Sequence, residues 1–185
     1  MFDEDSPYYD EYDGAYYLES SAKQGYHVAQ YRLGKMIYAG GYYRRIPENA
    51  EYWLLLSAKQ NNPYAEALLG RLYLTGDFLR LDRKAGVDLL YDAIRHGNAH
   101  AAYTLGKYYA EGKHLKKDIP KAIALLEQAA QMGDIHAEYR LAKIYLFESD
   151  CFDWQKAVEY LNTAAHKGNE NAYRALQNMS RNTVI

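Results

Sequence analysis

Residues 101–133, AAYTLGKYYAEGKHLKKDIPKAIALLEQAAQMG, form a unit that the rest of the chain repeats with variations. The Leu105-Gly106 pair in this unit recurs at intervals of 36 residues, with a last interval of 35 residues, and its counterparts are Leu33-Gly34, Leu69-Gly70, Leu141-Ala142 and Leu176. Self-similarity at a period of this length is typical of solenoids built from helical repeats. The period therefore predicts a repeat array for most of the 185 residues.

Apolar residues follow helical spacing in two segments of the unit. Ala101, Leu105 and Tyr109 recur every four residues, which predicts a first helix, the A helix, that Gly112 ends by taking positive φ. Asp118 is the expected N-cap of a second helix, the B helix. The apolar stripe of the B helix comprises Ala122, Leu125, Leu126, Ala129 and Ala130. Each unit is thus predicted to be a helical hairpin.

Transferring the pattern along the chain gives the domain organisation. A single repeat domain is expected over residues 10–182, after an acidic, Tyr-rich tail over residues 1–9. The expected elements are a B-type helix at 10–25, repeats at about 28–61, 64–97, 100–133 and 136–168, and a final A-type helix at 171–181. Half-repeats at both ends leave unpaired apolar faces. Either the terminal segments cover these faces, or the sequence is part of a longer protein.

Two corners between helices depart from the pattern. In GGYYRRIPENA, Ile46 stands where other repeats have Asp, so the following B helix begins without the usual side-chain cap. In FESDCFDW the glycine is missing and the corner is one residue shorter. The second corner is where we expect the structure to deviate most from the repeat.

Composition and charge indicate an ordinary globular chain with an unusual choice of aromatic residue. Hydrophobic residues make up 49% and charged residues 25%, but the chain has 21 Tyr, which suit half-buried surfaces. The formal net charge is −2. Residues 1–13 hold six acids and no Lys or Arg, so the remaining 18 acids face all 22 bases and the rest of the chain carries about +4.

The single cysteine, Cys151, excludes an internal disulfide and favours a reducing compartment. The chain has no run of 18 apolar residues and no basic segment followed by an apolar one of the kind found in export signals. We therefore expect a cytoplasmic protein without a membrane segment.

The pattern A-x-Y-x-L-G-x-x-Y-x-x-G, followed by a loop, D-x-x-K-A and two small residues before Gly, resembles the Sel1-like repeat, a relative of the tetratricopeptide repeat. The resemblance covers nearly the whole chain. It implies an all-α, right-handed α/α superhelix, a solenoid of about four and a half to five Sel1-like helical hairpins. It also implies a bacterial adaptor scaffold that binds a protein or peptide partner, with no catalysis and no cofactor.

Two subgroups of this family frame the alternatives. Some members are secreted and carry a disulfide in each repeat, and the single cysteine departs from them. In other members the repeats belong to larger polypeptides. The alternative function is therefore a non-catalytic regulatory or targeting segment of a larger bacterial enzyme, such as a DNA-processing or transfer protein.

In tetratricopeptide-like superhelices the A helices line a concave groove, so the resemblance implies a set of inward-facing positions on every A helix. These positions lie five and two residues before the repeat leucine, and two and five residues after it. The candidate ligand-binding residues are Tyr31, Lys35, Tyr38, Tyr64, Arg71, His100, Tyr103, Lys107, His136, Tyr139, Lys143, Asn171, Arg174 and Asn178. The remaining inward positions hold Val28, Ala67, Leu74, Ala110 and Leu146.

These positions include one cation per repeat, a series that we call the cation ladder: Lys35, Arg71, Lys107 and Lys143. Neighbouring helices lie about 8–10 Å apart, and an extended peptide advances about 3.3–3.6 Å per residue. A peptide with an acid at about every third residue would thus meet successive cations, which predicts an extended, acidic peptide as ligand. Two plainer interpretations stay open: the cations are only solvated, and the neighbouring Tyr residues pack between A helices.

The acidic tail is a second candidate ligand. Asp10 is the expected cap of the first helix and Asp13 lies in its first turn, so only residues 1–9 are free to reach a groove. The tail either docks into the groove of the same or a neighbouring molecule or forms a disordered linker. Self-association would use this tail or the exposed terminal helices.

Catalytic and metal-binding chemistry is not indicated. His96 and His100 have a spacing of four, but Gly97 and Asn98 place a turn between them, so they share no helical face. Asp150 and Asp153 beside Cys151 disfavour a thiolate. We expect no enzymatic activity, no cofactor and no metal site.

Nucleic-acid binding is weakly indicated by the loop Tyr42-Tyr43-Arg44-Arg45, which mixes aromatic and cationic residues as single-strand binders do. The Gly40-Gly41 pair before it lacks the Lys-Ser or Lys-Thr of a phosphate-binding loop. The small positive charge outside the tail argues against nucleic acid as a partner. Thr183-Val184-Ile185 resembles a PDZ ligand in only three residues.

Overall fold

The computed structural model describes residues 7–40, 43 and 45–182 of the chain. Within these residues the chain is helical and contains no strand, as the repeat pattern predicts. The helices are α1 Pro7–Lys23, α2 His27–Ala39, α3 Pro47–Ala58, α4 Pro63–Thr75, α5 Arg83–Arg95, α6 Ala99–Glu111, α7 Ile119–Gln131, α8 Ala137–Phe147, the 3-10 helix η1 Ser149–Cys151, α9 Trp154–His166 and α10 Glu170–Asn182.

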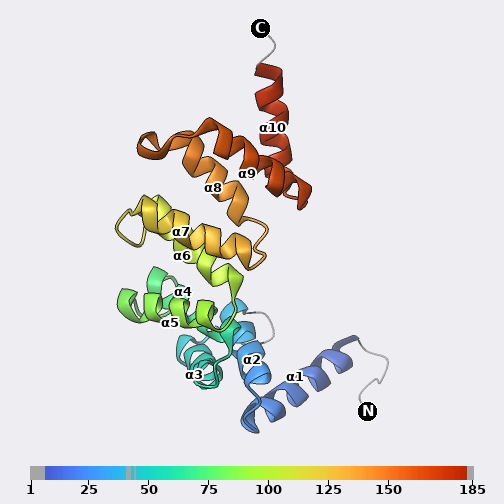
Figure 1. Ribbon diagram of the computed structural model, residues 1–185. Coiled ribbons are helices and arrows are strands. Elements are labelled where there is room, and N and C mark those ends of the chain that lie inside the picture. The colour runs from blue at the N-terminus through green and yellow to red at the C-terminus, as the bar shows by residue number, and fades with distance from the viewer. Residues whose placement is uncertain (1–6, 41–42, 44, 183–185) are drawn as a thin grey trace. The chain divides into compact units, whose positions relative to one another are not determined.

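The helices pack as two units, Met1–His96 with α1–α5 and Gly97–Ile185 with α6–α10. In unit 1, α2 pairs with α3 and α4 with α5, and in unit 2, α6 pairs with α7 and α8 with α9 (Figure 1). Each repeat of a solenoid contacts only its neighbours. The boundary between the two units therefore falls between two hairpins, inside the domain that the sequence predicts over residues 10–182.

A buried leucine and a small residue hold each A helix against its B helix. Leu33, Leu69, Leu105 and Leu141 are at most 2% exposed. A Cβ atom added at Gly106 would lie 2.8 Å from Cγ of Leu126, closer than real side chains approach. The small residue after the leucine thus allows the close approach of the two helices that the sequence predicts.

The B helices begin as their sequences indicate. Asp82, Asp118 and Asp153 each accept a hydrogen bond, 3.0 Å long, from a backbone N–H three residues later. Ile46 precedes α3 without a side-chain cap. The corner of the fourth repeat also deviates as expected, because α8 ends at Glu148 in an extended conformation and a 3-10 turn follows. In contrast, Gly76 and Gly112 end α4 and α6 in the left-handed conformation.

The first helix begins earlier than the sequence predicts. Helix α1 starts at Pro7, so Asp10 lies inside the helix and is not its N-cap. Proline fits the first turn because its missing N–H would have no helical partner there. The tail outside this helix is residues 1–6, which lie outside the described residues together with the predicted docking of the tail and the C-terminal Thr183-Val184-Ile185. Among the described helices, none has both the length and the apolar composition needed to span a lipid bilayer.

Candidate functional site

The fourteen candidate ligand-binding residues lie on the A helices α2, α4, α6, α8 and α10 or at their starts, and none of them is buried. We call this set of residues the A-helix face. Leu74, predicted to point inward with them, is 0% exposed. It belongs to the core because its backbone lies against Gly86 of α5, so it is not a surface position.

In unit 1, the cations of the A-helix face rest on aromatic rings. The Tyr31 ring lies 5.9 Å from the ring of Tyr64 in the next repeat, and the Lys35 ammonium lies 5.8 Å from the Tyr31 ring centre. The Arg71 guanidinium lies 5.6 Å from the Tyr38 ring centre, and its Nη2 donates to the Tyr38 hydroxyl at 3.4 Å. Both members of the cation ladder in this unit are therefore engaged within the protein.

In unit 2, two imidazoles flank one tyrosine. His100 stacks on Tyr103 with ring centres 5.4 Å apart, and Tyr103 lies 5.9 Å from the ring of His136 in the next repeat. Among the described residues, Lys107 and Lys143 make no ion pair, ring contact or side-chain hydrogen bond. The cation ladder thus consists of two engaged members in unit 1 and two free members in unit 2.

Asp134 fixes one of these imidazoles. Its Oδ1 accepts a hydrogen bond from the backbone N–H of His136 at 2.9 Å, and its Oδ2 lies 3.2 Å from Nδ1 of His100. Burial alone would raise the pKa of this carboxyl group. The hydrogen bonds from His100 and from the backbone of His136, with the charge of both imidazoles, outweigh burial and lower the pKa. Asp134 is therefore ionised at neutral pH and holds the His100 ring beside Tyr103.

Buried Asn and Asp residues before the A helices were not predicted from the sequence. The side-chain oxygens of Asn62, Asn98 and Asn169 accept hydrogen bonds from the first backbone N–H groups of the helices that follow, and Asp134 accepts one from His136, the residue just before α8. The side-chain nitrogens of Asn62 and Asn169 also donate to the carbonyls of His27 and Ile135, at the start of the previous A helix. The side chains of Asn62 and Asn169 thus tie each A helix to the previous A helix of the same unit.

A sequence signal for these residues exists. Each of them directly follows the stop residue of a B helix, at positions one repeat apart. The exception is Tyr26, which precedes α2 without a side-chain cap. Among the described residues, no A helix precedes α2 that a side chain at this position could bind.

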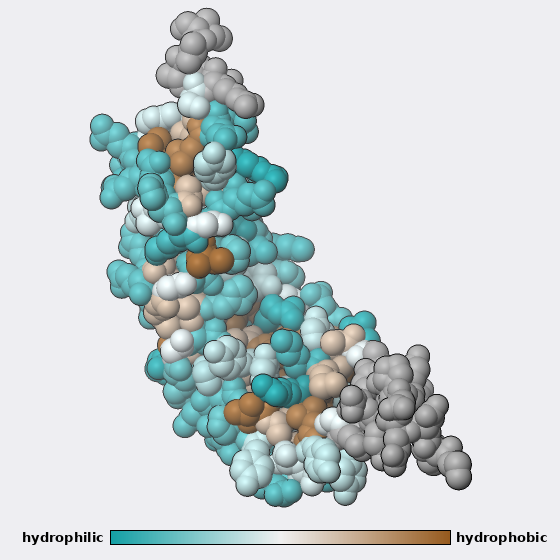
Figure 2. Space-filling view, turned by 90° about the vertical axis from the view of Figure 1, so that its right-hand side faces the viewer, coloured by the Kyte–Doolittle hydropathy of each residue, from teal (hydrophilic) through white to brown (hydrophobic). Residues whose placement is uncertain are grey.

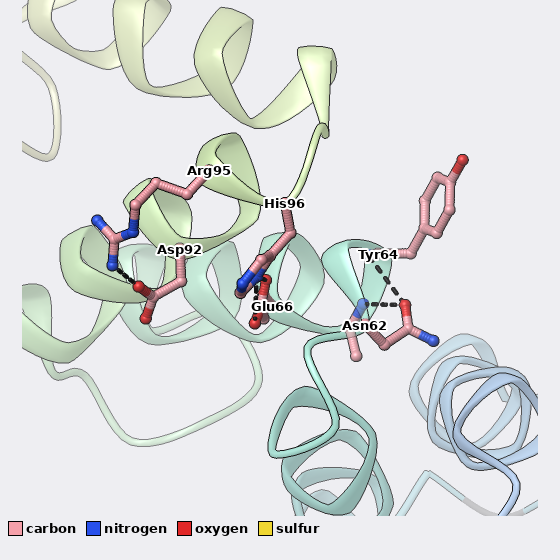
Figure 3. A network of polar contacts seen from close by, with 7 residues as sticks. Asn62, Tyr64, Glu66, Asp92, Arg95 and His96 are labelled. Atoms are coloured by element: carbon pink, nitrogen blue, oxygen red, sulfur yellow. Dashed lines mark hydrogen bonds and ion pairs between the residues drawn. The ribbon is translucent and has the colours of Figure 1, made fainter.

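Two buried glutamates were also missed. Glu66 of α4 is buried, and its two oxygens lie 2.8 and 3.0 Å from Nδ1 of His96 at the end of α5. Figure 3 shows the two side chains pointing toward each other, near the separate Asp92 and Arg95 pair. Glu138 of α8 binds the ammonium of Lys167 through Oε1, while its buried Oε2 has no partner among the described residues. Both pairs tie an A helix to the end of its own B helix.

The alternative chemical sites have structural roles or no reactive group. Burial, together with Glu148 and Asp150, raises the pKa of the Cys151 thiol and so disfavours the reactive thiolate form. His96 and His100 bind different carboxylates, those of Glu66 and Asp134. No three His, Cys, Asp or Glu side chains gather as metal ligands within the part of the chain that the structure describes.

The loop considered for nucleic acid uses its described side chains for packing. The Tyr43 hydroxyl donates to the carbonyl of Ala15 at 3.4 Å. Arg45 donates to the carbonyl of Tyr38 at 3.0 Å and lies over the ring of Phe78. Tyr42 and Arg44 lie outside the described residues. On the face shown in Figure 2, hydrophilic residues predominate and the hydrophobic residues form separate patches.

Comparison with known families and structures identifies the repeat. The family model described as the Sel1 repeat matches residues 7–26, 27–62, 63–98, 99–134 and 135–169, which together make up most of the chain. A search of curated proteins gave no significant match.

Solved structures of Sel1 repeat proteins have the same fold. A Sel1 repeat protein from Oxalobacter formigenes is 31% identical with a TM-score of 0.74, over 84% of this chain and 64% of that one. The protective antigen c5321 of uropathogenic Escherichia coli is 26% identical with a TM-score of 0.77, over 88% of this chain and 35% of that one. The chain thus spans less than two thirds of the length of either protein. With five matched repeats and these similarities, the chain belongs to the Sel1 repeat family.

Proposed function

We propose that this chain is a protein-binding scaffold that holds an extended, acidic peptide on its A-helix face, with Lys107 and Lys143 as the main charged contacts. Sel1 repeat proteins generally mediate protein–protein interactions, and the repeat scaffold is generally non-catalytic. The observation that carries the finer proposal is that these two ammonium groups have no partner in the described structure, whereas Lys35 and Arg71 do.

The difference in pairing has an energetic consequence. A ligand carboxylate that binds Lys107 or Lys143 breaks no internal contact. A carboxylate that binds Arg71 competes with the Tyr38 ring and hydroxyl. Each exposed ion pair contributes only about 0–1 kcal/mol and weakens with salt, so the two lysines alone give weak binding.

Aromatic contacts supply the rest of the expected affinity. Tyr103 and Tyr139 lie two residues before the repeat leucines of α6 and α8 and are partly exposed. A tyrosine ring offers apolar area to the peptide while its hydroxyl stays hydrated. We therefore expect a ligand that has apolar groups between its acids, in an extended conformation.

The test is a charge reversal in each unit. The probe is a labelled synthetic peptide with Glu at every third residue, and the readout is fluorescence anisotropy at low and at physiological salt. Lys107→Glu with Lys143→Glu should weaken binding at least tenfold, about 1.4 kcal/mol. The matched pair Lys35→Glu with Arg71→Glu should weaken binding less, because those cations are already engaged.

Two results would contradict the proposal. One is an unchanged affinity in the Lys107 and Lys143 double variant, and the other is an equal loss in both double variants. Circular dichroism at the assay temperature confirms that each variant is folded. This matters most for Arg71, whose side chain is half-buried.

A further inference from the structure

Large aromatic side chains are exposed at one corner of unit 2. Phe147, Phe152 and Trp154 are 75%, 61% and 50% exposed, and we call them the aromatic corner. The backbone N–H of Asp153 donates to the carbonyl of Tyr145 at 3.0 Å and holds the end of α8 at the start of α9. The other Phe and Trp side chains of the described residues, Phe78 and Trp53, pack against the core of unit 1. Every exposed Phe or Trp in the described part of the chain thus lies at this corner.

The repeat fold does not require these aromatic residues. At the place of Phe147, the second and third repeats have Thr75 and Glu111. At the place of Trp154 they have Arg83 and Ile119. Exposed aromatic groups on a monomer carry a cost in hydration and often mark a binding surface.

An open groove of about 850 Å³ begins at Trp154 and follows α9. Trp154, Val158, Asn162 and His166 in its lining are spaced by four residues and so share one face of the helix. The matching residues of α7 are Ile119 and Ile123 at its start, and they pack against a core that includes residues of α8 and α9. Elsewhere in unit 2, this face of a B helix is therefore covered by further helices, which indicates that a helix fits the groove.

The charges at this surface favour a basic partner. The Asp150 carboxylate contacts only the neighbouring Ser149 hydroxyl, and the Glu159 carboxylate makes no ion pair among the described residues. The cations nearby are engaged: Lys156 lies over the Tyr145 ring, and Lys167 binds Glu138. Two carboxylates are thus available beside exposed aromatic rings, which attract cations through their faces.

We propose that the aromatic corner and the α9 groove form a docking surface for a basic, amphipathic helix of a partner protein, separate from the A-helix face. The apolar side of the helix packs on Trp154 and Val158 along the groove. Its Lys or Arg side chains reach Asp150, Glu159 and the rings of the corner. Helix-in-groove binding of this kind uses a few apolar anchors at helical spacing.

The probes are two synthetic helical peptides that carry the same leucines at i, i+3, i+4 and i+7. One has Lys at its polar positions and the other has Gln. The variant Phe152→Ser with Trp154→Ser removes two anchors. The matched control, Tyr26→Ser with Tyr52→Ser, removes two aromatic groups of unit 1 that are 62% and 55% exposed.

The Lys peptide should bind saturably in an anisotropy titration, at least tenfold more weakly to the corner variant and with unchanged affinity to the control. The Gln peptide should bind at least tenfold more weakly than the Lys peptide. Lys107→Glu with Lys143→Glu should leave the affinity for the Lys peptide undiminished, which separates this surface from the A-helix face. Three results would overturn the proposal: binding of the Lys peptide that does not saturate, equal affinity of the corner variant and the parent for the Lys peptide, or equal affinity of the parent for both peptides.

Discussion

The A helices bury nearly the same side chains in both units, but they expose different ones. The repeat leucine is buried in all four hairpins. On the exposed side, the Tyr31 ring of unit 1 lies beside the Tyr64 ring, and the Tyr103 ring of unit 2 lies between two imidazoles. Packing against the B helix therefore constrains one side of each A helix, while the opposite side is free to differ and is where binding specificity can arise.

On the buried side, one difference between the hairpins lies in the small residues where the two helices meet. The small residues that face each other in the four hairpins are Gly34 and Ala50, Gly70 and Gly86, Gly106 and Ala122, and Ala142 and Ala157. In the second hairpin, a Cβ atom added at Gly70 would lie 2.9 Å from the backbone oxygen of Gly86. In this hairpin the backbones of the two helices are in direct contact. An added Cβ atom would therefore meet backbone atoms, which cannot move aside as a side chain can.

The largest expected effect tests the two sides of a single helix. Leu105→Ala removes a fully buried side chain and should lower the free energy of unfolding by about 2–5 kcal/mol. Lys107→Ala, two residues away on the exposed side, should change it by less than about 0.5 kcal/mol. Urea unfolding followed by circular dichroism measures both. Equal shifts of the midpoint would show that the two faces are wrongly assigned.

A second position on the buried side differs in chemistry from repeat to repeat. Three residues before the repeat leucine stand Gln30, Glu66, Ala102 and Glu138, and at the end of the B helix stand Gln60, His96, Met132 and Lys167. Gln60 donates to Gln30 at 2.9 Å, and the glutamates pair with the cationic or imidazole side chains. The third repeat replaces the polar pair by two apolar residues. The position therefore accepts any pair that leaves no buried charge uncompensated.

An exchange between repeats tests this rule. Lys167→Met leaves the buried Glu138 carboxylate without a counter-charge and should cost about 1–3 kcal/mol, reduced from the value for a fully buried pair because Lys167 is exposed. Glu138→Ala with Lys167→Met reproduces the pair of the third repeat and should recover most of this loss. Chemical unfolding of both single variants and the double variant gives the coupling energy. A double variant as unstable as Lys167→Met would contradict the rule.

Features that depend on nearby residues in the chain could be predicted, and those that depend on the next repeat could not. The Asp118 cap was predicted because its hydrogen-bond donor lies three residues away. Glu66 and Asn62 bind His96 and His27, which are 30 and 35 residues distant, so helical spacing within one segment gives no sign of them. Comparing the repeats with one another would have shown both positions.

The candidate site shows the same limit. Its residues follow from the repeat register, which placed fourteen of them on the A helices without burying any. Their pairing does not follow, because whether Arg71 lies on the Tyr38 ring depends on side-chain conformations in two neighbouring repeats. The difference between engaged cations in unit 1 and free cations in unit 2 could therefore be seen only in the structure.

The smallest expected effect concerns Asp134, the aspartate at a position that is asparagine in three other repeats. Asp134→Asn keeps an oxygen that can accept the hydrogen bond from the backbone N–H of His136 but removes the charge beside His100. The pKa of Asp134 is lowered in the folded protein, so its charge stabilises the fold above the ordinary carboxyl pKa, and this contribution is lost as the pH falls through the folded value. The variant should therefore be less stable than the parent by less than about 1 kcal/mol at neutral pH, because His100 is exposed and solvent screens the pair. Thermal unfolding between about pH 7 and pH 3 should show the difference shrinking below about pH 4.

Asp150→Asn, at an exposed carboxylate whose contact is the neighbouring Ser149, should show no such trend. A difference that stays constant with pH in Asp134→Asn would mean that the hydrogen bond to the His136 backbone, and not the charge beside His100, sets the role of this residue.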